Sequence, residues 1–198
     1  MIILNCLIGA ERLLTPGGWE EGRVIEIRAG RFARTAAGTA ADFHAAVLSP
    51  GLIDPHIHGG DGFDVMHPTE EGMAAWLAGL AEAGVAAVAA SPYTAPPEVI
   101  RDSLEVISRV MERQKKEGLP GARLLGAHLE GPFISKNRLG AMEERYVLPP
   151  GAENCRRLIE GYEPILLEMT LAPEEPGADE VIRLLDSLGV RVQAGHCD

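Results

Sequence analysis

From Val47 onward, short apolar runs alternate with amphipathic stretches, and this alternation limits the fold more than any other feature of the chain. Strands are expected over 48–58, 85–90, 123–129, 164–170 and 190–194, and the apolar run over 48–58 is expected to be buried. Helices are expected over 70–83, 96–117, 152–160 and 178–188. Apolar strands that alternate with helices are typical of a parallel sheet covered by helices. We therefore predict an α/β fold whose roughly five strands make just over half of an eight-stranded barrel.

Two of the expected helices carry end signals. Thr69 can cap the first helix, and Glu70 and Glu71 follow in its first turn, where carboxylates suit the positive end of the helix dipole. Gly118 directly follows the second helix, as is common at a helix carboxyl end.

The first 48 residues have a different pattern and predict a small β layer. Residues 1–8 are rich in strand-forming side chains, and residues 23–28 alternate between apolar and polar. A Thr-Pro-Gly-Gly turn signal at 15–18 lies between them. We expect a small β domain over 1–48 and the half-barrel over 49–198.

Charge and cysteine content exclude several classes of protein. With 18 basic and 29 acidic residues, the net charge is −11, which disfavours binding to nucleic acid or to an anionic membrane. No apolar run is long enough to span a bilayer, and the start does not resemble a signal peptide. The cysteines, Cys6, Cys155 and Cys197, are odd in number and widely spaced, which favours a reducing cytoplasm.

Four potential metal ligands fall at the ends of three predicted strands. They are His56, His58, Glu130 and His196. Active sites of parallel α/β folds gather at the carboxyl ends of the strands. Two histidines at i and i+2 of a strand share one face and can reach one ion together. Mixed imidazole and carboxylate ligation predicts one or two divalent ions, Zn or Fe first and Mn or Co as alternatives.

The remaining polar residues near these strand ends are weaker candidates. Asp54 and His128 each lie two residues before a predicted ligand, so they share its strand face and could support the ligands from behind. For His128, packing in the barrel is the favoured interpretation. His44 and His67 are expected at the surface.

Four segments carry a family resemblance. PGLIDPHIHG (50–59), GAHLEGPFIS (126–135), TLAPEE (170–175) and AGHCD (194–198) resemble strand ends of the N-acetylglucosamine-6-phosphate deacetylases of the amidohydrolase superfamily. The resemblance spans essentially the whole chain but only the first half of a family member. It implies a metal-dependent hydrolase that removes acetate from N-acetylglucosamine 6-phosphate and leaves glucosamine 6-phosphate.

The resemblance also implies roles for particular residues. Glu130 and His196 would bind the catalytic metal, and His56 with His58 would hold a second one, with Glu130 bridging. The general-base Asp and a further histidine ligand would lie beyond residue 198, so no catalytic residue is assigned within this chain, and little activity is expected of the chain alone. C-terminal strands of the family would complete a β-sandwich with residues 1–48. The partners expected are a small amino sugar phosphate and a second copy in a homodimer.

One segment departs from the family pattern. Family members usually carry Gly-Ala-His where this chain has Gly140, Ala141 and Met142, and that histidine contacts the sugar. We expect these three residues at the substrate site, with altered contacts.

Two other functions stay open at this stage. A dihydroorotase-like amidohydrolase shares the first motif but normally uses a lysine after the fourth strand, where this chain reads Leu-Glu-Met-Thr over 167–170. A half-barrel with unpaired edge strands could instead be a non-catalytic interaction module.

Overall fold

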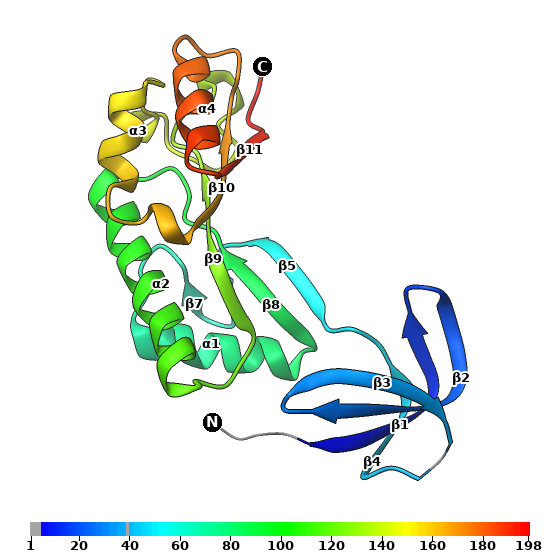
Figure 1. The fold of residues 1–198 in the computed structure, drawn as a ribbon. Coiled ribbons are helices and arrows are strands. Elements are labelled where there is room, and N and C mark those ends of the chain that lie inside the picture. The colour runs from blue at the N-terminus through cyan, green and yellow to red at the C-terminus, as the bar shows by residue number, and fades with distance from the viewer. Residues whose placement is uncertain (1–4, 39) are drawn as a thin grey trace. The chain divides into compact units, whose positions relative to one another are not determined.

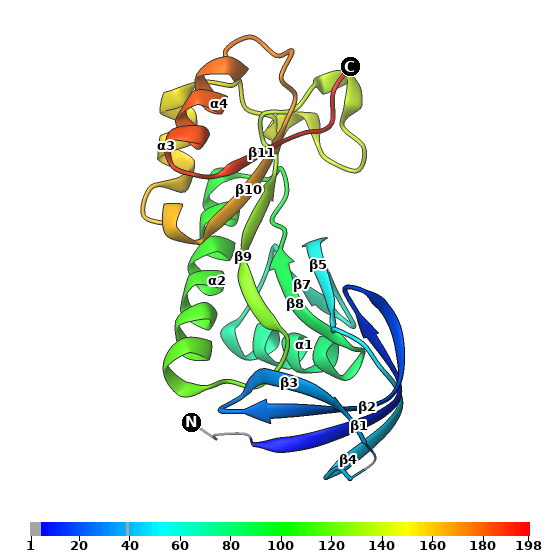
Figure 2. The same cartoon turned by 45° about the vertical axis from the view of Figure 1, so that its right-hand side comes forward.

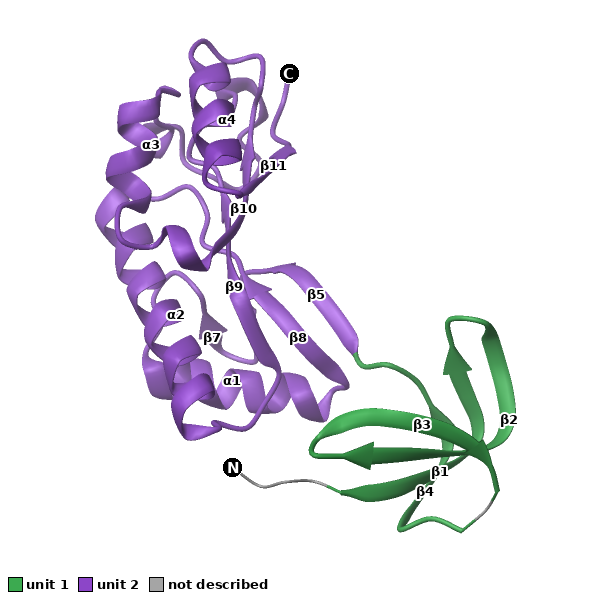
Figure 3. Ribbon diagram, in the orientation of Figure 1, with its two compact units in different colours: residues 1–51 green, residues 52–198 purple. Residues whose placement is uncertain are grey.

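The computed structural model describes residues 5–38 and 40–198, and these divide into two compact units, 1–51 and 52–198. Figure 3 colours the units separately. The predicted boundary at residues 48 and 49, and the assignment of the units to parts of larger domains, remain predictions.

Unit 2 contains the predicted parallel sheet, so the α/β fold class is confirmed. Its strands lie in the order β11-β10-β9-β8-β5, and every neighbouring pair is parallel. The strands are β5 (Leu52–Ile57), β8 (Val85–Ala90), β9 (Arg123–Glu130), β10 (Leu166–Leu171) and β11 (Arg191–Ala194). Because the strand order follows the chain and such crossovers are right-handed, the connecting helices lie on one face of the curved sheet (Figures 1 and 2).

The helices begin and end close to the residues that the sequence indicates. They are α1 (Glu70–Glu82), α2 (Pro97–Glu117), α3 (Ala152–Ile159) and α4 (Ala178–Ser187). The Thr69 hydroxyl accepts a hydrogen bond from the Gly72 amide, which confirms the predicted cap. Gly118 ends α2 in the left-handed region at φ 69°, where glycine is favoured.

Two short strands and three 3₁₀ helices, at Lys136–Arg138, Glu144–Tyr146 and Glu163–Ile165, were not expected from the sequence. Strands β6 (Gly59–Gly60) and β7 (Phe63–Asp64) form a small antiparallel hairpin directly after β5. The strand predicted over 164–170 begins later than expected, because residues Glu163–Ile165 form a 3₁₀ turn that contains Pro164.

The prediction that the run around Leu52 is a buried strand was wrong. Strand β5 lies at the edge of the sheet and pairs only with β8 among the described residues. Leu52 and Ile53 are each 66% exposed, although their side chains belong to opposite faces of the strand. The apolar sequence is typical of a buried strand, but at the edge of the sheet both faces of β5 are exposed to solvent.

The core of unit 2 lies between the sheet and its helices. It is built from aliphatic side chains of α1, α2, α4 and the three central strands, among them Met73, Leu77, Leu104, Ile107, Leu129, Met169 and Leu185. Ser103 is buried within it, and its hydroxyl donates to the Val65 carbonyl oxygen at 2.6 Å. None of the described helices combines the length and apolar character needed to cross a membrane.

Unit 1 is a single four-stranded sheet in the order β3-β2-β1-β4. Its strands are β1 (Cys6–Thr15), β2 (Gly18–Arg28), β3 (Arg31–Ala37) and β4 (Phe43–Leu48). The predicted turn at 15–18 joins β1 to β2, while residues 1–4 of the first predicted strand lie outside the described residues. A small cluster of Ala10, Leu13 and Ile25 forms its core.

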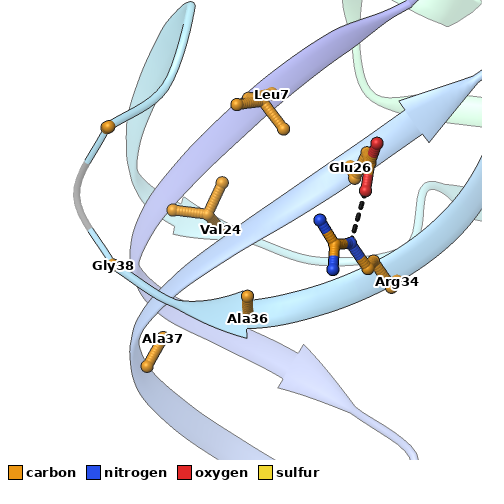
Figure 4. A pocket seen from close by; sticks show the side chains of 8 residues that line it. Leu7, Val24, Glu26, Arg34, Ala36, Ala37 and Gly38 are labelled. Carbon is orange, nitrogen blue, oxygen red and sulfur yellow. Dashed lines mark hydrogen bonds and ion pairs between the residues drawn. The ribbon is translucent and has the colours of Figure 1, made fainter.

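Figure 4 shows a hollow of about 330 Å³ on unit 1. The Glu26 carboxylate accepts hydrogen bonds from Arg34 and Arg28, both at 2.5 Å, and the bond with Arg34 leads the causes that lower its pKa. The other lining side chains are aliphatic. The charge of Glu26 in this hollow is therefore neutralised by arginines, so its carboxylate is not available to bind a cation.

The burial of Cys155 in α3 makes a testable prediction. Its side chain is fully buried, and burial raises the pKa of the thiol to about 12. A thiol-reactive dye at pH 8 is therefore expected to label Cys6 and Cys197, which are partly exposed, and to label Cys155 only after unfolding. Because the thiol pKa is higher in the folded than in the unfolded chain, this group's stabilising contribution is lost as pH rises from about 9 toward 12.

A Cys155→Ala variant serves as the matched control. It should show the same labelling when folded and one label fewer after unfolding. Rapid labelling of all three thiols in the folded wild-type chain would contradict the burial of Cys155.

Candidate metal centre

The four predicted ligands meet at the carboxyl edge of the sheet. His56 lies in β5 and His58 follows that strand directly. Glu130 is the last residue of β9, and His196 follows β11 by two residues. Since β5 and β11 each lie two strands away from β9, a flat sheet would place them about 10 Å from it. The curvature of the sheet is what brings side chains from both edges to the central strand.

The Glu130 carboxylate is the centre of this group. Its Oε2 lies 3.1 Å from His58 Nε2 and 3.7 Å from His56 Nε2. Its Oε1 lies 3.0 Å from His196 Nε2. One carboxylate therefore separates a pair of imidazoles on one side from a single imidazole on the other.

The outer nitrogens of two of these rings are fixed by backbone carbonyls. His58 Nδ1 lies 2.6 Å from the Ser91 carbonyl oxygen, and His196 Nδ1 lies 2.7 Å from that of Arg138. A carbonyl only accepts, so each Nδ1 carries a hydrogen and donates it. In the neutral ring the lone pair is then on Nε2, the atom that faces Glu130.

The donor set fits a divalent metal ion. Ligand atoms of His56, His58 and Glu130 all lie within 4.8 Å of one another. Two ligands bound tetrahedrally to zinc at 2.0–2.2 Å lie roughly 3.4 Å apart, and the nitrogen–oxygen separations of 3.1 and 3.7 Å lie on either side of that value. These residues could therefore hold a metal without rearrangement of the backbone.

Glu130 and His58 stabilise each other's charge in the metal-free protein. The hydrogen bond with His58 is the largest cause that lowers the pKa of Glu130 to about 2, and it outweighs the opposing effect of burial. The same hydrogen bond raises the pKa of His58. A proton held between a nitrogen and a carboxylate occupies the place that a cation takes in a metal site, so protons and metal compete here.

The other two imidazoles respond differently to their surroundings. Burial lowers the pKa of His56, more strongly than the Glu130 charge raises it. Burial opposes the proton on His196 as well, but hydrogen bonds with the Arg138 carbonyl and with Glu130 outweigh burial and raise its pKa.

The backbone around Glu130 is held on both sides. The Glu130 amide donates to the Pro92 carbonyl oxygen at 2.9 Å, and the Thr94 hydroxyl donates to the Glu130 carbonyl oxygen at 3.2 Å. Gly131 then turns the chain at φ 87°, and a Cβ there would lie 2.1 Å from Thr94 Oγ1. Only glycine fits this close approach, which explains the Glu-Gly sequence at the end of the strand.

Asp54 and His128 occupy different positions relative to the ligands. Asp54 Oδ1 accepts a hydrogen bond from the His56 backbone amide at 3.1 Å, which fits a role in shaping the strand. His128 is buried, and its Nδ1 lies 3.2 Å from His56 Nδ1. Of the two, only His128 contacts a predicted ligand ring.

The predicted substrate segment lies beside the cluster. A Cβ on Gly140 would lie 3.3 Å from His196 Cε1, which places the segment against that ring. Ala141 and Met142 line a hollow of about 340 Å³ together with Tyr93, whose ring meets the His58 ring edge-on at 5.3 Å. These positions agree with a place next to the site, while a role in substrate binding remains a prediction.

Ser91, Tyr93 and Thr170 contact the cluster but were not identified from the sequence. Ser91 directly follows β8, so the rule that selected the other strand ends would also have selected it. Thr170 ends the strand expected over 164–170, so the same rule would have selected it too. Tyr93 carried no comparable signal, because a tyrosine in a loop is common.

The Glu130 ion pairs predict how the metal-free protein responds to acid. A carboxylate whose pKa is lowered by folding contributes stability above its unfolded value of about 4.5 and loses that contribution as pH falls toward 2. In chelator-treated protein, Glu130→Gln should remove roughly 1–3 kcal/mol of this pH-dependent stability. Urea unfolding at a series of pH values measures it, and Glu144→Gln, at an exposed glutamate, is the control. If the unfolding free energies of wild type and Glu130→Gln changed with pH in parallel, the ion pairs of Glu130 would not stabilise the fold.

Comparison with known proteins agrees with the sequence resemblance. No family model matches the chain. It is 33% identical over 196 residues to the N-acetylglucosamine-6-phosphate deacetylase of Vibrio furnissii, an alignment covering 96% of this chain and 48% of that protein. It is 32% identical over 192 residues to an N-acetylgalactosamine-6-phosphate deacetylase of Escherichia coli O157:H7, covering 96% of this chain and 50% of that one.

A solved structure gives the same result. The N-acetyl-D-glucosamine-6-phosphate deacetylase of Mycobacterium smegmatis, in a mutant complex with N-acetyl-D-glucosamine-6-phosphate, matches with a TM-score of 0.82 and 29% identity. That match covers 98% of this chain and 50% of that structure. The chain spans about half the length of the relatives it matches. It is thus similar, over nearly its whole length, to about half of an N-acetylglucosamine-6-phosphate deacetylase.

Proposed function

We propose that the cluster of His56, His58, Glu130 and His196 is the metal centre of a deacetylase that acts on an acetylated amino sugar phosphate. The observation that carries this proposal is the convergence of three imidazole Nε2 atoms on the Glu130 carboxylate. The similarity to deacetylases of both N-acetylglucosamine and N-acetylgalactosamine 6-phosphate supports the substrate class. Zinc or iron suits the donor set best, with manganese or cobalt as alternatives.

The two sides of Glu130 favour distinct metal positions. His56, His58 and Glu130 Oε2 would hold one ion. His196 and Glu130 Oε1 would hold another, together with the further histidine that the family resemblance implies beyond residue 198. Glu130 would then bridge the two ions. Each imidazole is suited to its role because its Nε2 faces the carboxylate.

A divalent metal in such a site supplies Lewis-acid polarisation of the amide carbonyl and activation of a water molecule. The chain's own residues orient this chemistry. The Ser91 and Arg138 carbonyls fix two imidazoles, and the segment at Gly140, Ala141 and Met142 borders the space where the substrate would lie. The family resemblance implies that the proton-transferring Asp lies beyond residue 198.

We also propose that the sheet of unit 1 is one layer of a composite β-sandwich. Phe32 and Phe43 are more than 60% exposed, and Ile8, Leu14 and other apolar side chains line a hollow of about 450 Å³ on this unit. An apolar sheet face of this kind is suited to packing against a second sheet. A homodimer remains a prediction.

Metal analysis tests the proposed centre. Wild-type protein should bind at least one zinc ion per chain, and His58→Ala and Glu130→Ala should each lower zinc content at least tenfold at limiting metal. His44→Ala is the matched control, because His44 is an exposed histidine of β4 in unit 1 and is not one of the predicted ligands. Elemental mass spectrometry after gel filtration measures the stoichiometry. Equal zinc content in all four proteins would overturn the assignment.

Acetate release tests the proposed reaction. Zinc-loaded chain should release acetate from N-acetylglucosamine 6-phosphate or N-acetylgalactosamine 6-phosphate only slowly, because the general-base Asp is expected beyond residue 198. The rate should still exceed that of chelator-treated chain, and Glu130→Gln should abolish this zinc-dependent difference. His44→Ala, at an exposed position of unit 1, should leave the rate unchanged. Hydrolysis of dihydroorotate in place of either sugar, or acetate release that persists in Glu130→Gln, would contradict the proposal.

A further inference from the structure

The buried imidazole of His128 links His56 to two strands on the far side of β9. His128 is only 2% exposed. Its Nδ1 lies 3.2 Å from His56 Nδ1, and its Nε2 lies 2.8 Å from Thr170 Oγ1 in β10. The Thr170 hydroxyl in turn donates to Gln193 Oε1 in β11 at 3.3 Å. A continuous chain of side-chain hydrogen bonds therefore runs across the sheet behind the metal centre.

The direction of this chain follows from its far end. Gln193 Oε1 can only accept, so the hydrogen bond between it and Thr170 requires the Thr170 hydroxyl to donate, which leaves Oγ1 to accept from His128. His128 Nε2 must then carry a hydrogen. In a neutral imidazole its Nδ1 is left as an acceptor, and it receives the hydrogen on His56 Nδ1.

We propose that His128, Thr170 and Gln193 form a positioning network that holds His56 with its hydrogen on Nδ1 and its lone pair on Nε2. This inference rests on the proposed metal centre, for which Nε2 is the required ligand atom. It completes a pattern, because His58 and His196 are fixed in the same form by the carbonyls of Ser91 and Arg138. Beside His56, the imidazole of His128 takes the position that a backbone carbonyl takes beside the other two rings.

The competing arrangement would disable His56. The Pro55 carbonyl oxygen also lies 3.2 Å from His128 Nδ1, so a His128 with its hydrogen on Nδ1 would donate to Pro55 and face His56 Nδ1. The hydrogen on His56 would then move to Nε2 and block the ligand atom. The Thr170 hydroxyl favours the first arrangement, because its Oγ1 accepts a hydrogen bond from His128 and so stabilises the form of His128 that carries its hydrogen on Nε2.

Zinc affinity tests the network at Thr170. Competition with a chromophoric chelator should show that Thr170→Val, which removes the hydroxyl at nearly equal volume, weakens zinc binding about tenfold or more. Thr170→Ser keeps the hydroxyl and should bind zinc within about twofold of wild type. The cobalt-loaded proteins should differ in their visible absorption spectra in the same order.

Two substitutions of His128 separate positioning from packing. His128→Asn can place an acceptor oxygen near the former Nδ1, while His128→Gln can place a donor near the former Nε2 but offers His56 no acceptor. We expect Asn to retain more zinc affinity than Gln, by at least about fivefold. A role in packing alone predicts the reverse or no difference, since the glutamine side chain fills more of the imidazole volume.

The control for general loss of a buried hydroxyl is Ser103→Ala, which removes the hydrogen bond to Val65 away from the cluster. It should lower the unfolding temperature without changing zinc affinity.

If Thr170→Val does not fold, substitutions of the exposed Gln193 replace it. Gln193→Met removes the acceptor of the Thr170 hydroxyl and should weaken zinc binding about threefold, whereas Gln193→Glu keeps an acceptor and should not weaken it.

The outcomes distinguish this inference from the proposed metal centre. Normal zinc binding by wild type, with affinity unchanged in Thr170→Val or in Gln193→Met, would overturn the network and leave the metal centre intact. Failure of the wild-type chain to bind zinc would instead overturn the metal centre, and the network with it.

Discussion

The contact of Glu130 with three imidazoles is the interaction on which the candidate site depends. A carboxylate at the end of a largely buried strand needs partners, because an unpaired charge there would be costly. Glu130 finds them on both oxygens, from His56 and His58 on one side and His196 on the other. The same contacts hold protons in the metal-free protein and provide a ready position for a cation.

This arrangement requires a curved sheet. His58 and His196 come from the two opposite edges of the five-stranded sheet, and Glu130 comes from its centre. The parallel strand order places every carboxyl end at one edge, and the curvature then turns the outer strands toward the middle. Backbone carbonyls at Ser91 and Arg138, and the buried ring of His128, fix the imidazoles from behind.

The sequence was sufficient for the elements that local patterns determine. The helix cap at Thr69, the left-handed end at Gly118 and the alternation of strands and helices all follow from side-chain chemistry within a few residues. The strand-end rule also brought together Glu130 and its histidine partners, because the carboxyl ends of parallel strands all lie at one edge of the sheet. These predictions succeeded because they needed no knowledge of long-range packing.

Features that depend on long-range packing were not predictable. The exposure of Leu52 results from the place of β5 at the sheet edge, which its apolar sequence does not reveal. For His128 the sequence favoured packing over support of a ligand, and only its distances to His56 and Thr170 favour support. Thr170 ended a predicted strand, but its contacts with His128 and Gln193, both more than 20 positions away, were not predictable from the sequence.

X-ray absorption at the zinc edge of the zinc-loaded chain tests the central claim most directly, since it reports the ligand atoms themselves. The account predicts a first shell of nitrogen and oxygen at about 2.0–2.2 Å with the outer-shell scattering of imidazole rings. A first shell containing sulfur at about 2.3 Å, or one of oxygen alone without imidazole features, would contradict it.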